Sequence, residues 1–135
     1  MAMVEVTFPG SKKIDASIAG HRVHTDQSIE NGGENAAPEP FQVFLASVAT
    51  CAGIYAKSFC DQRSLPSPLS LEMDVVRSDH GILSHIYIVL HVDAEFPTKY
   101  DPAIIRSMEL CAVKKQLRDE IETSVRVTRV EASSS

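Results

Sequence analysis

Three cysteines, Cys51, Cys60 and Cys111, are the side chains of this 135-residue chain best suited to covalent or redox chemistry. Cys51 and Cys60 share one apolar segment, FLASVATCAGIYAKSFC, in which their spacing puts them on opposite sides of a helix. A thiol in an apolar helix is most often buried as a small hydrophobic side chain. Cys51 also lies too far along the helix to benefit from its dipole, so a reactive thiolate there needs a cation brought in by folding.

Cys111 has a different setting, because Lys114 and Lys115 follow it at about one helical turn. Basic side chains near a thiol favour the reactive thiolate. On the residues alone, either Cys51 or Cys111 can therefore be the attacking group, and simple packing remains the alternative for both.

Histidines offer the other chemistry, and they are interpreted as solvated strand residues. His21 and His24 fall on one expected strand, and His85 and His91 share a face of another. The sequence contains no HExxH, CxxC or close Cys/His cluster, and no phosphate-binding glycine loop. We therefore expect neither a metal nor a cofactor.

Composition is that of an ordinary globular protein, with 44% hydrophobic and 23% charged residues. A net charge of -5 argues against a nucleic-acid partner, which needs clustered Lys and Arg. No segment is expected to span a membrane, and the N-terminal residues lack the pattern of a signal peptide. We therefore expect a cytoplasmic protein, whose three cysteines do not form a structural disulfide framework.

Periodicity predicts the elements that must position these side chains. Alternating segments predict strands at 4–8, 14–18 and 21–25, and the polar stretch 27–38 is expected to be a long, functional loop. A helix is expected from 41 to 63, and its apolar residues occupy every side. Such a helix is buried on several sides, which in so small a domain suggests packing against a second chain.

The second half of the chain continues the same mixed pattern. Strands are expected at 71–75, 84–92 and 122–131, with a helix whose N-cap is Asp101 between the last two. The order βββ–α–ββ–α–β predicts an α+β fold. We expect a single domain over 1–135 with a frayed tail at about 132–135.

Two sequence motifs and the order of the elements resemble a known protein family, and the resemblance covers nearly the whole chain. Pro40 to Cys51, continued by Tyr55, Lys57 and the Arg-Ser-Leu-Pro of 63–66, resembles the central-helix signature of the OsmC/Ohr superfamily. This superfamily comprises the osmotically inducible protein C and organic hydroperoxide resistance proteins. Leu-Cys-Ala-Val-Lys-Lys at 110–115 resembles its second signature, a cysteine followed by small, hydrophobic and basic residues.

The resemblance implies a thiol-dependent hydroperoxide reductase that acts in oxidative-stress defence. Cys51 would attack the peroxide and become a sulfenic acid, and Cys111 would condense with it to a disulfide. A dithiol reductant, lipoyl-type or other, would restore both thiols. The resemblance also implies an OsmC-like fold with a long buried central helix, an intertwined homodimer, and active sites at the subunit interface.

The sequence departs from the family at the residues that hold the thiolate. Catalytic members carry a Glu just after the helix-start Pro, where this chain has Phe41, and Glu39 lies earlier. The family arginine falls where Lys12 and Lys13 stand, with Arg22 a weaker candidate. A lysine supplies charge but not the planar fork of an arginine. In this departure the chain resembles the OsmC-related branch of the superfamily, whose members keep both cysteines.

Two functional hypotheses follow. In the first, Cys51 and Cys111 form the redox pair of a peroxidase, Lys13 or Lys12 stabilises the thiolate, and a small hydroperoxide binds beside Phe41, Phe44 and Tyr55. In the second, the same apolar cleft holds a hydrophobic ligand and the cysteines are passive. A third possibility is a redox sensor that passes its disulfide to a partner. Phe41 motivates the second hypothesis, because it makes the cleft more apolar.

Overall fold

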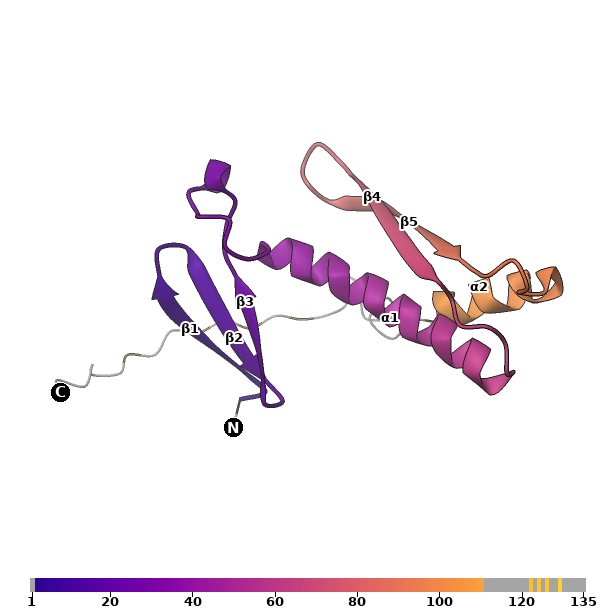
Figure 1. Cartoon of the computed structure of the whole chain (residues 1–135). Helices are drawn as coiled ribbons and strands as arrows, with labels where there is room; N and C mark the ends of the chain where they lie inside the picture. Colours follow the sequence, from indigo (N-terminus) through magenta and orange to yellow (C-terminus); the bar gives the residue numbers. More distant parts are fainter. Residues whose placement is uncertain (1, 111–121, 123, 125, 127–128, 130–135) are drawn as a thin grey trace.

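In the computed structural model of the chain, the described residues are 2–110, 122, 124, 126 and 129. Over these residues the chain forms a three-stranded sheet, a two-stranded sheet and two α-helices, in the order β1–β2–β3–α1–β4–β5–α2 (Figure 1). The expected α+β class and the order of elements through the second helix are confirmed. The strand expected at 122–131 and the tail at 132–135 fall mostly or wholly outside the described residues.

The N-terminal sheet consists of β1 (Val4–Gly10), β2 (Lys13–Ile18) and β3 (His21–Thr25), all antiparallel. Val4 pairs with Ile18, and Ile14 pairs with Thr25, so side chains of one pleat gather on one face. That face is mostly apolar: it carries Val4, Val6, Phe8, Ile14, Ala16, Ile18 and Val23, together with His21 and Thr25 on β3.

This apolar face is solvent-exposed in a single copy of the chain. Val6 is 48% exposed and Phe8 is 76% exposed, and every residue of β1 is classed as exposed. An apolar sheet face of this kind is normally buried against another layer. The described part of the chain therefore leaves one side of its N-terminal sheet uncovered.

The central helix α1 spans Pro40–Gln62, within one residue at each end of the expected range. Pro40 occupies the first turn, where its missing N–H is not needed, and the N–H of Glu39 donates to Gln42 Oε1 at 2.9 Å. The helix ends at Arg63, whose N–H donates to the carbonyl of Cys60 at 3.1 Å. Proline at position 66 prevents the helix from continuing.

A single copy buries only one side of α1. Its buried residues are Val48, Ala52, Ala56, Phe59 and Cys60. Ile54, on another side, is 58% exposed. By length and composition α1 is apolar enough to cross a membrane, a test that the core helix of a globular domain also passes. Its packing against β4 and α2 is that of a core helix.

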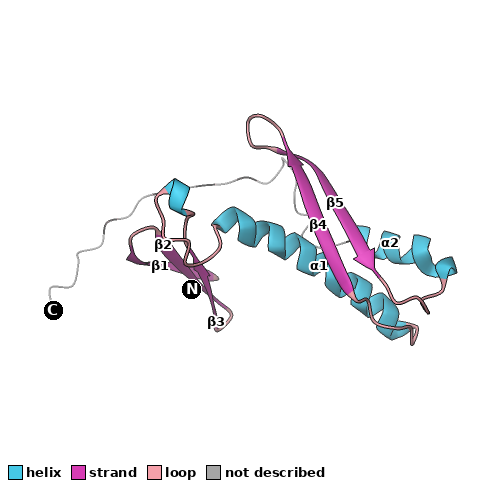
Figure 2. Cartoon of the chain, turned by 45° about the horizontal axis from the view of Figure 1, so that its top comes forward, coloured by secondary structure: helices cyan, strands magenta, loops and turns pink. Residues whose placement is uncertain are grey.

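The hairpin of β4 (Ser70–Arg77) and β5 (Leu83–His91) packs across α1 (Figure 2). Met73 pairs with Ile88, and alternate residues on both strands face the helix. Their neighbours, including the expected outward residues His85, Tyr87 and His91, are exposed.

The second helix, α2, spans Asp101–Glu109 and follows a 3-10 turn at Thr98–Tyr100. Its cap is Tyr100, so the expectation that Asp101 is the N-cap is wrong: the preceding turn runs directly into the helix and makes Asp101 helical. Ile104 and Met108 are buried against α1. The hydrophobic core lies between α1 and α2. Its buried residues are Ala52, Ala56, Phe59, Cys60, Phe96, Ile104 and Met108.

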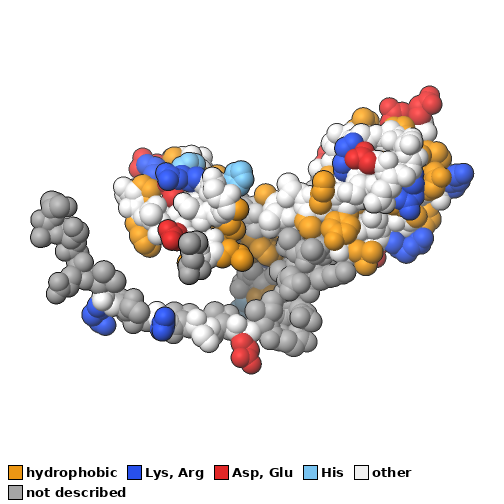
Figure 3. All heavy atoms as spheres, turned by 90° about the horizontal axis from the view of Figure 1, so that it is seen from below, with side chains coloured by type: hydrophobic (Ala, Val, Ile, Leu, Met, Phe, Trp, Pro, Cys, Tyr) orange, Lys and Arg blue, Asp and Glu red, His pale blue; other side chains and the backbone are white. Residues whose placement is uncertain are grey.

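The molecule consequently has two parts joined by α1. The N-terminal sheet lies beside the start of the helix, whereas the hairpin and α2 pack along the rest of it (Figures 1 and 2). Hydrophobic side chains are visible on the surface of both parts (Figure 3). The core lies entirely in the larger part, which means that the N-terminal sheet gains little burial from its own chain.

Candidate functional site

Cys51 lies near the middle of α1 and is partly buried. It is about 16 Å along the axis from the start of the helix, which is beyond the reach of the helix dipole. Helical spacing places it on the same side of α1 as Phe44, Ser47 and Tyr55. Any thiolate at Cys51 must therefore be stabilised by groups from outside its own helix terminus.

Cys60 lies on the opposite side of α1 and is 0% exposed. Burial raises the pKa of the Cys60 thiol, and the neighbouring carboxylate of Asp61 raises it further, against smaller opposing effects from Lys57 and Arg63. A neutral, inaccessible thiol is neither a nucleophile nor a metal ligand. Of the two cysteines on the helix, Cys51 is the one that is not fully buried.

Cys111, the third cysteine, lies outside the described residues, as do Lys114 and Lys115. The continuous described segment ends at Leu110, the C-cap of α2. The pairing of Cys51 with Cys111 therefore stays a prediction from the sequence motifs.

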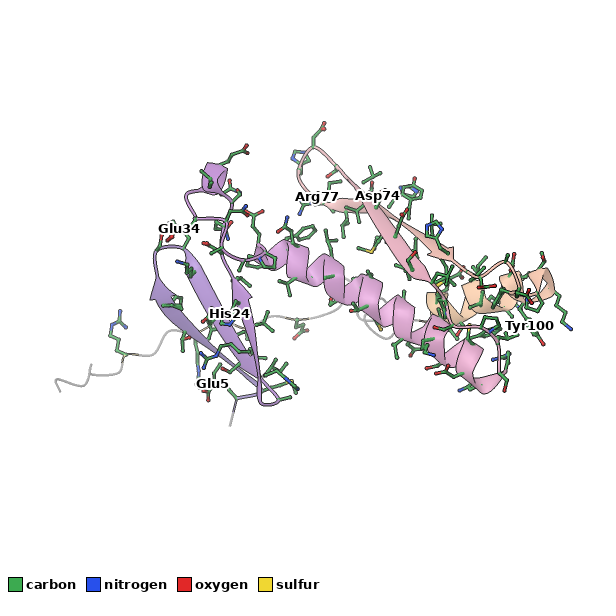
Figure 4. The ribbon with its side chains drawn as sticks, viewed as in Figure 1. Glu5, His24, Glu34, Asp74, Arg77 and Tyr100 are labelled. Carbon is green, nitrogen blue, oxygen red and sulfur yellow. The ribbon has the colours of Figure 1, made fainter. Side chains whose placement is uncertain are left out.

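The expected thiolate-stabilising lysines lie at the β1–β2 turn, in the N-terminal sheet. Lys13 Nζ forms an ion pair with Glu34 Oε1 at 3.1 Å, and both side chains are solvent-exposed. The side chain of Lys12 lies beside Gly32, which belongs to the same loop as Glu34. Figure 4 shows Glu34 at the end of the sheet, beyond the start of α1. Within one chain, the structure thus brings Lys13 to Glu34 rather than to the middle of α1.

The loop that carries Glu34 is organised by Asp26, a residue that the sequence analysis did not single out. Its side chain is 0% exposed, and it accepts hydrogen bonds from the backbone N–H groups of Gln27 (2.8 Å), Ala36 (3.0 Å) and Glu34 (3.3 Å). The bonds from Ala36 and Gln27 lower the pKa of Asp26 from its ordinary value, although burial opposes them. An aspartate directly after a strand and before a polar, glycine-containing stretch was the signal available in the sequence.

The loop closes onto the start of α1. Asp26 N–H donates to the carbonyl of Pro38 at 3.1 Å, and Asn31 Nδ2 donates to Glu39 Oε2 at 2.8 Å. Gly33 packs so closely on Gln27 that a Cβ there has no room. Glu39, the acid nearest to the missing family Glu, is therefore used to join the loop to the helix.

Phe41, which replaces the family Glu, makes an aromatic site of its own. Its ring contacts that of Phe44 at 5.6 Å between centroids. The guanidinium of Arg77 lies 3.7 Å from the Phe41 ring centroid, in cation–π geometry. Sequence analysis missed Arg77, because nothing in the chain indicates that the end of β4 meets the start of α1.

Tyr55 is not part of this aromatic pair. It lies three turns further along α1, where it lines a cleft of about 480 Å³ between α1 and α2. Within one chain, Phe41 and Phe44 pack together, and Tyr55 lies further along the same side of α1 as Phe44, so the expectation that all three share one substrate cleft stays a prediction.

One histidine of each sheet lies beside a carboxylate. His24 Nδ1 lies 3.0 Å from Asp15 Oδ1 on the polar face of the N-terminal sheet, where Figure 4 labels His24. His91 Nε2 lies 3.5 Å from Glu72 Oε2 across the hairpin. Among the described residues, no three His, Cys, Asp or Glu side chains come together in a way that would hold a metal ion.

Comparisons with known proteins place this geometry in a family. Among solved structures, a protein from Psychrobacter arcticus 273-4, described as an osmotic stress induced and detoxification response protein, is similar with a TM-score of 0.72 and 18% identity, over 88% of this chain and 90% of that one. An organic hydroperoxide resistance protein OsmC from Legionella pneumophila is similar with a TM-score of 0.55 and 15% identity, over 86% and 88%.

An OsmC-like protein from Vibrio cholerae O1 biovar eltor is also similar, with a TM-score of 0.58 and 14% identity, over 83% of this chain and 90% of that one. No curated protein matches the sequence. The sequence profile of OsmC-like proteins matches residues 32–126. On this match the chain belongs to the OsmC-like protein family.

Proposed function

We propose that the protein is a thiol-dependent reductase of organic hydroperoxides that acts in oxidative-stress defence in the cytoplasm. One observation carries the proposal: of the two thiols on α1, only Cys51 is not fully buried. Cys51 is also the cysteine of the family's helix motif. The similar Psychrobacter and Legionella proteins are described as a detoxification response protein and an organic hydroperoxide resistance protein, which agrees with this activity.

The reaction uses two thiols. The Cys51 thiolate attacks one peroxide oxygen, the O–O bond breaks, and the alkoxide leaves and takes up a proton as the alcohol. Cys51 is then a sulfenic acid. Cys111 attacks its sulfur, the S–S bond forms and water leaves. A dithiol reductant exchanges with this disulfide, which returns both cysteines to thiols and leaves the reductant as its own disulfide.

A homodimer completes the site in this proposal. The uncovered apolar face of the N-terminal sheet supports a second copy as the missing layer. The chain is then one OsmC-like domain whose partner is another copy of itself. Its other partners are a small hydroperoxide and a dithiol, with no nucleic acid, membrane, metal or cofactor.

The charged group that stabilises the Cys51 thiolate in this proposal is Lys13, or Lys12 beside it. The ion pair of Lys13 with Glu34 is solvent-exposed, and such pairs contribute about 0–1 kcal/mol, so Lys13 is readily redirected. Because the N-terminal sheet is distant from the middle of α1 in its own chain, the assembly of the dimer has to bring lysine and thiolate together.

The disulfide tests the mechanism directly. On addition of one equivalent of cumene hydroperoxide, peptide mapping of the non-reduced protein is expected to find Cys51 joined to Cys111. In a Cys111→Ser variant, Cys51 is expected to stop at the sulfenic acid, which dimedone traps. A protein that forms neither species while remaining folded would contradict the mechanism.

A second candidate function rests on Phe41. The Phe41–Phe44 pair, with Arg77 over the Phe41 ring, is an apolar site with one cation where catalytic relatives place an acid. A binding module would use this site for a hydrophobic ligand and would leave both cysteines passive. Ligand affinity that is unchanged by Cys51→Ser, without peroxide turnover, would favour this function. Oxidation without repeated turnover would instead indicate a redox sensor.

A further inference from the structure

The cleft between α1 and α2 is separate from the Phe41–Phe44 site and has the size of a small-molecule site. Its volume is about 480 Å³, within the usual range of ligand pockets. Tyr55 and Phe59 from α1 and Ala103 from α2 supply apolar walls. The hydroxyl of Ser107 lies 3.5 Å from the carbonyl of Tyr55, which joins the two walls.

Two arginines line this cleft, Arg63 after the end of α1 and Arg106 in the last turn of α2. None of the lining residues is acidic. Within residues 2–110, neither arginine forms an ion pair. Among the described residues, the cleft therefore has two positive charges and no acidic partner, which is unexpected on a chain whose net charge is -5.

Arg63 is solvent-exposed, but its guanidinium is held against Phe59. Its guanidinium lies 3.7 Å from the centroid of the Phe59 ring, and Nη1 donates to the carbonyl of Phe59 at 3.2 Å. A guanidinium has five N–H donors in a planar fork, so these two contacts leave donors available. Tyr100 meets the Phe59 ring in edge geometry at 6.1 Å, which fixes the aromatic support (Figure 4 labels Tyr100).

We propose that this cleft binds an organic carboxylate with an apolar body. The carboxylate lies between Arg63 and Arg106, because an arginine fork matches a carboxylate in both charge and geometry. The body of the ligand packs against Tyr55 and Ala103. The site requires no redox chemistry, so it stands or falls independently of the peroxidase proposal.

The experiment compares 4-phenylbutyrate with 4-phenylbutyramide, which has the same body without the charge. Both are titrated into the full-length Cys51→Ser protein, and binding is followed by isothermal calorimetry and by ¹⁵N chemical shifts. The carboxylate is expected to bind about tenfold more tightly than the amide, and less tightly as salt is raised. Shift changes are expected along the second half of α1 and along α2.

Two variants and one control test whether Arg63 and Arg106 bind the carboxylate of the ligand. Arg106→Gln and Arg63→Gln are each expected to weaken phenylbutyrate binding about tenfold and to leave the amide unchanged. Arg106 is exposed, so its replacement tests the proposal even where Arg63→Gln perturbs the end of α1. Arg22→Gln, on β3, is the matched control and is expected to change nothing. Equal binding of acid and amide, shift changes elsewhere, or no binding at millimolar concentration would overturn the proposal.

Discussion

Cys60 should be chemically silent in the native protein, and the structure sets the scale of its protection. The thiol is 0% exposed and belongs to the same buried core as Ala56 and Ile104. An alkylating reagent reaches it only when the core opens. If opening requires the free energy of global unfolding, typically about 5 kcal/mol or more, the native reaction is slowed more than a thousandfold relative to the unfolded chain.

The raised pKa of Cys60 acts in the same direction. Alkylation requires the thiolate, and a pKa above the ordinary value leaves less thiolate at neutral pH. The protein is first reduced and freed of reductant, then treated with iodoacetamide at pH 7, and each cysteine is followed by peptide mass spectrometry. In urea at a concentration that unfolds the chain, Cys60 is expected to react at the rate of an ordinary thiol.

Cys51 provides the internal comparison, because it lies on the same helix and is only partly buried. Cys51 is expected to be alkylated well before Cys60 in the native protein. Labelling of Cys60 in native protein at a rate within tenfold of its rate in urea would refute the assignment of Cys60 to the core. It would also remove the reason for choosing Cys51 over Cys60 as the nucleophile.

Three further outcomes follow from the loop and the helix. Gly33→Ala is expected to lower the free energy of unfolding by about 1–3 kcal/mol in urea melts, because a Cβ there would lie 2.6 Å from the carbonyl carbon of Gln27 and 2.8 Å from Asp26 Oδ1. Gly53→Ala, in α1 with nothing within 4 Å, is the matched control and is expected to stabilise by about 0.5–1 kcal/mol; a loss as large as that of Gly33→Ala would contradict the steric argument. Asp26→Asn is expected to destabilise the protein above the ordinary pKa of 3.8. Because the folded state lowers that pKa, the deficit should shrink as pH falls through the folded value, and urea melts showing a deficit independent of pH would refute this.

Much of the fold was predictable because its elements have strong local signals. Alternation located the five described strands, and Pro40 followed by a long apolar run located α1. The N-cap of α2 was predicted at Asp101, one residue after its position at Tyr100. The 3-10 turn at Thr98–Tyr100, which shifts the cap, depends on how Tyr100 packs against Phe59 and Phe96. Packing of this kind involves residues far apart in sequence and leaves no local pattern.

The candidate site was predictable only in part, for the same reason. The helix motif singled out Cys51, and helical spacing placed Cys60 on the opposite side, as observed. The contacts of Arg77 with Phe41 and of Lys13 with Glu34 join distant segments, and no periodicity indicates them. The grouping of Phe41, Phe44 and Tyr55 in one substrate cleft stays a prediction: within one chain, Phe41 and Phe44 pack together, and Tyr55 lies three helical turns beyond Phe44.

Peroxide turnover tests the central claim most directly. Reduction of tert-butyl and cumene hydroperoxide is measured with dihydrolipoamide, and separately with dithiothreitol, for the wild type and for Cys51→Ser, Cys111→Ser and Cys60→Ala. The account predicts turnover by the wild type and Cys60→Ala, and none by Cys51→Ser. A folded wild type without turnover, or a Cys51→Ser variant that keeps it, would contradict the account.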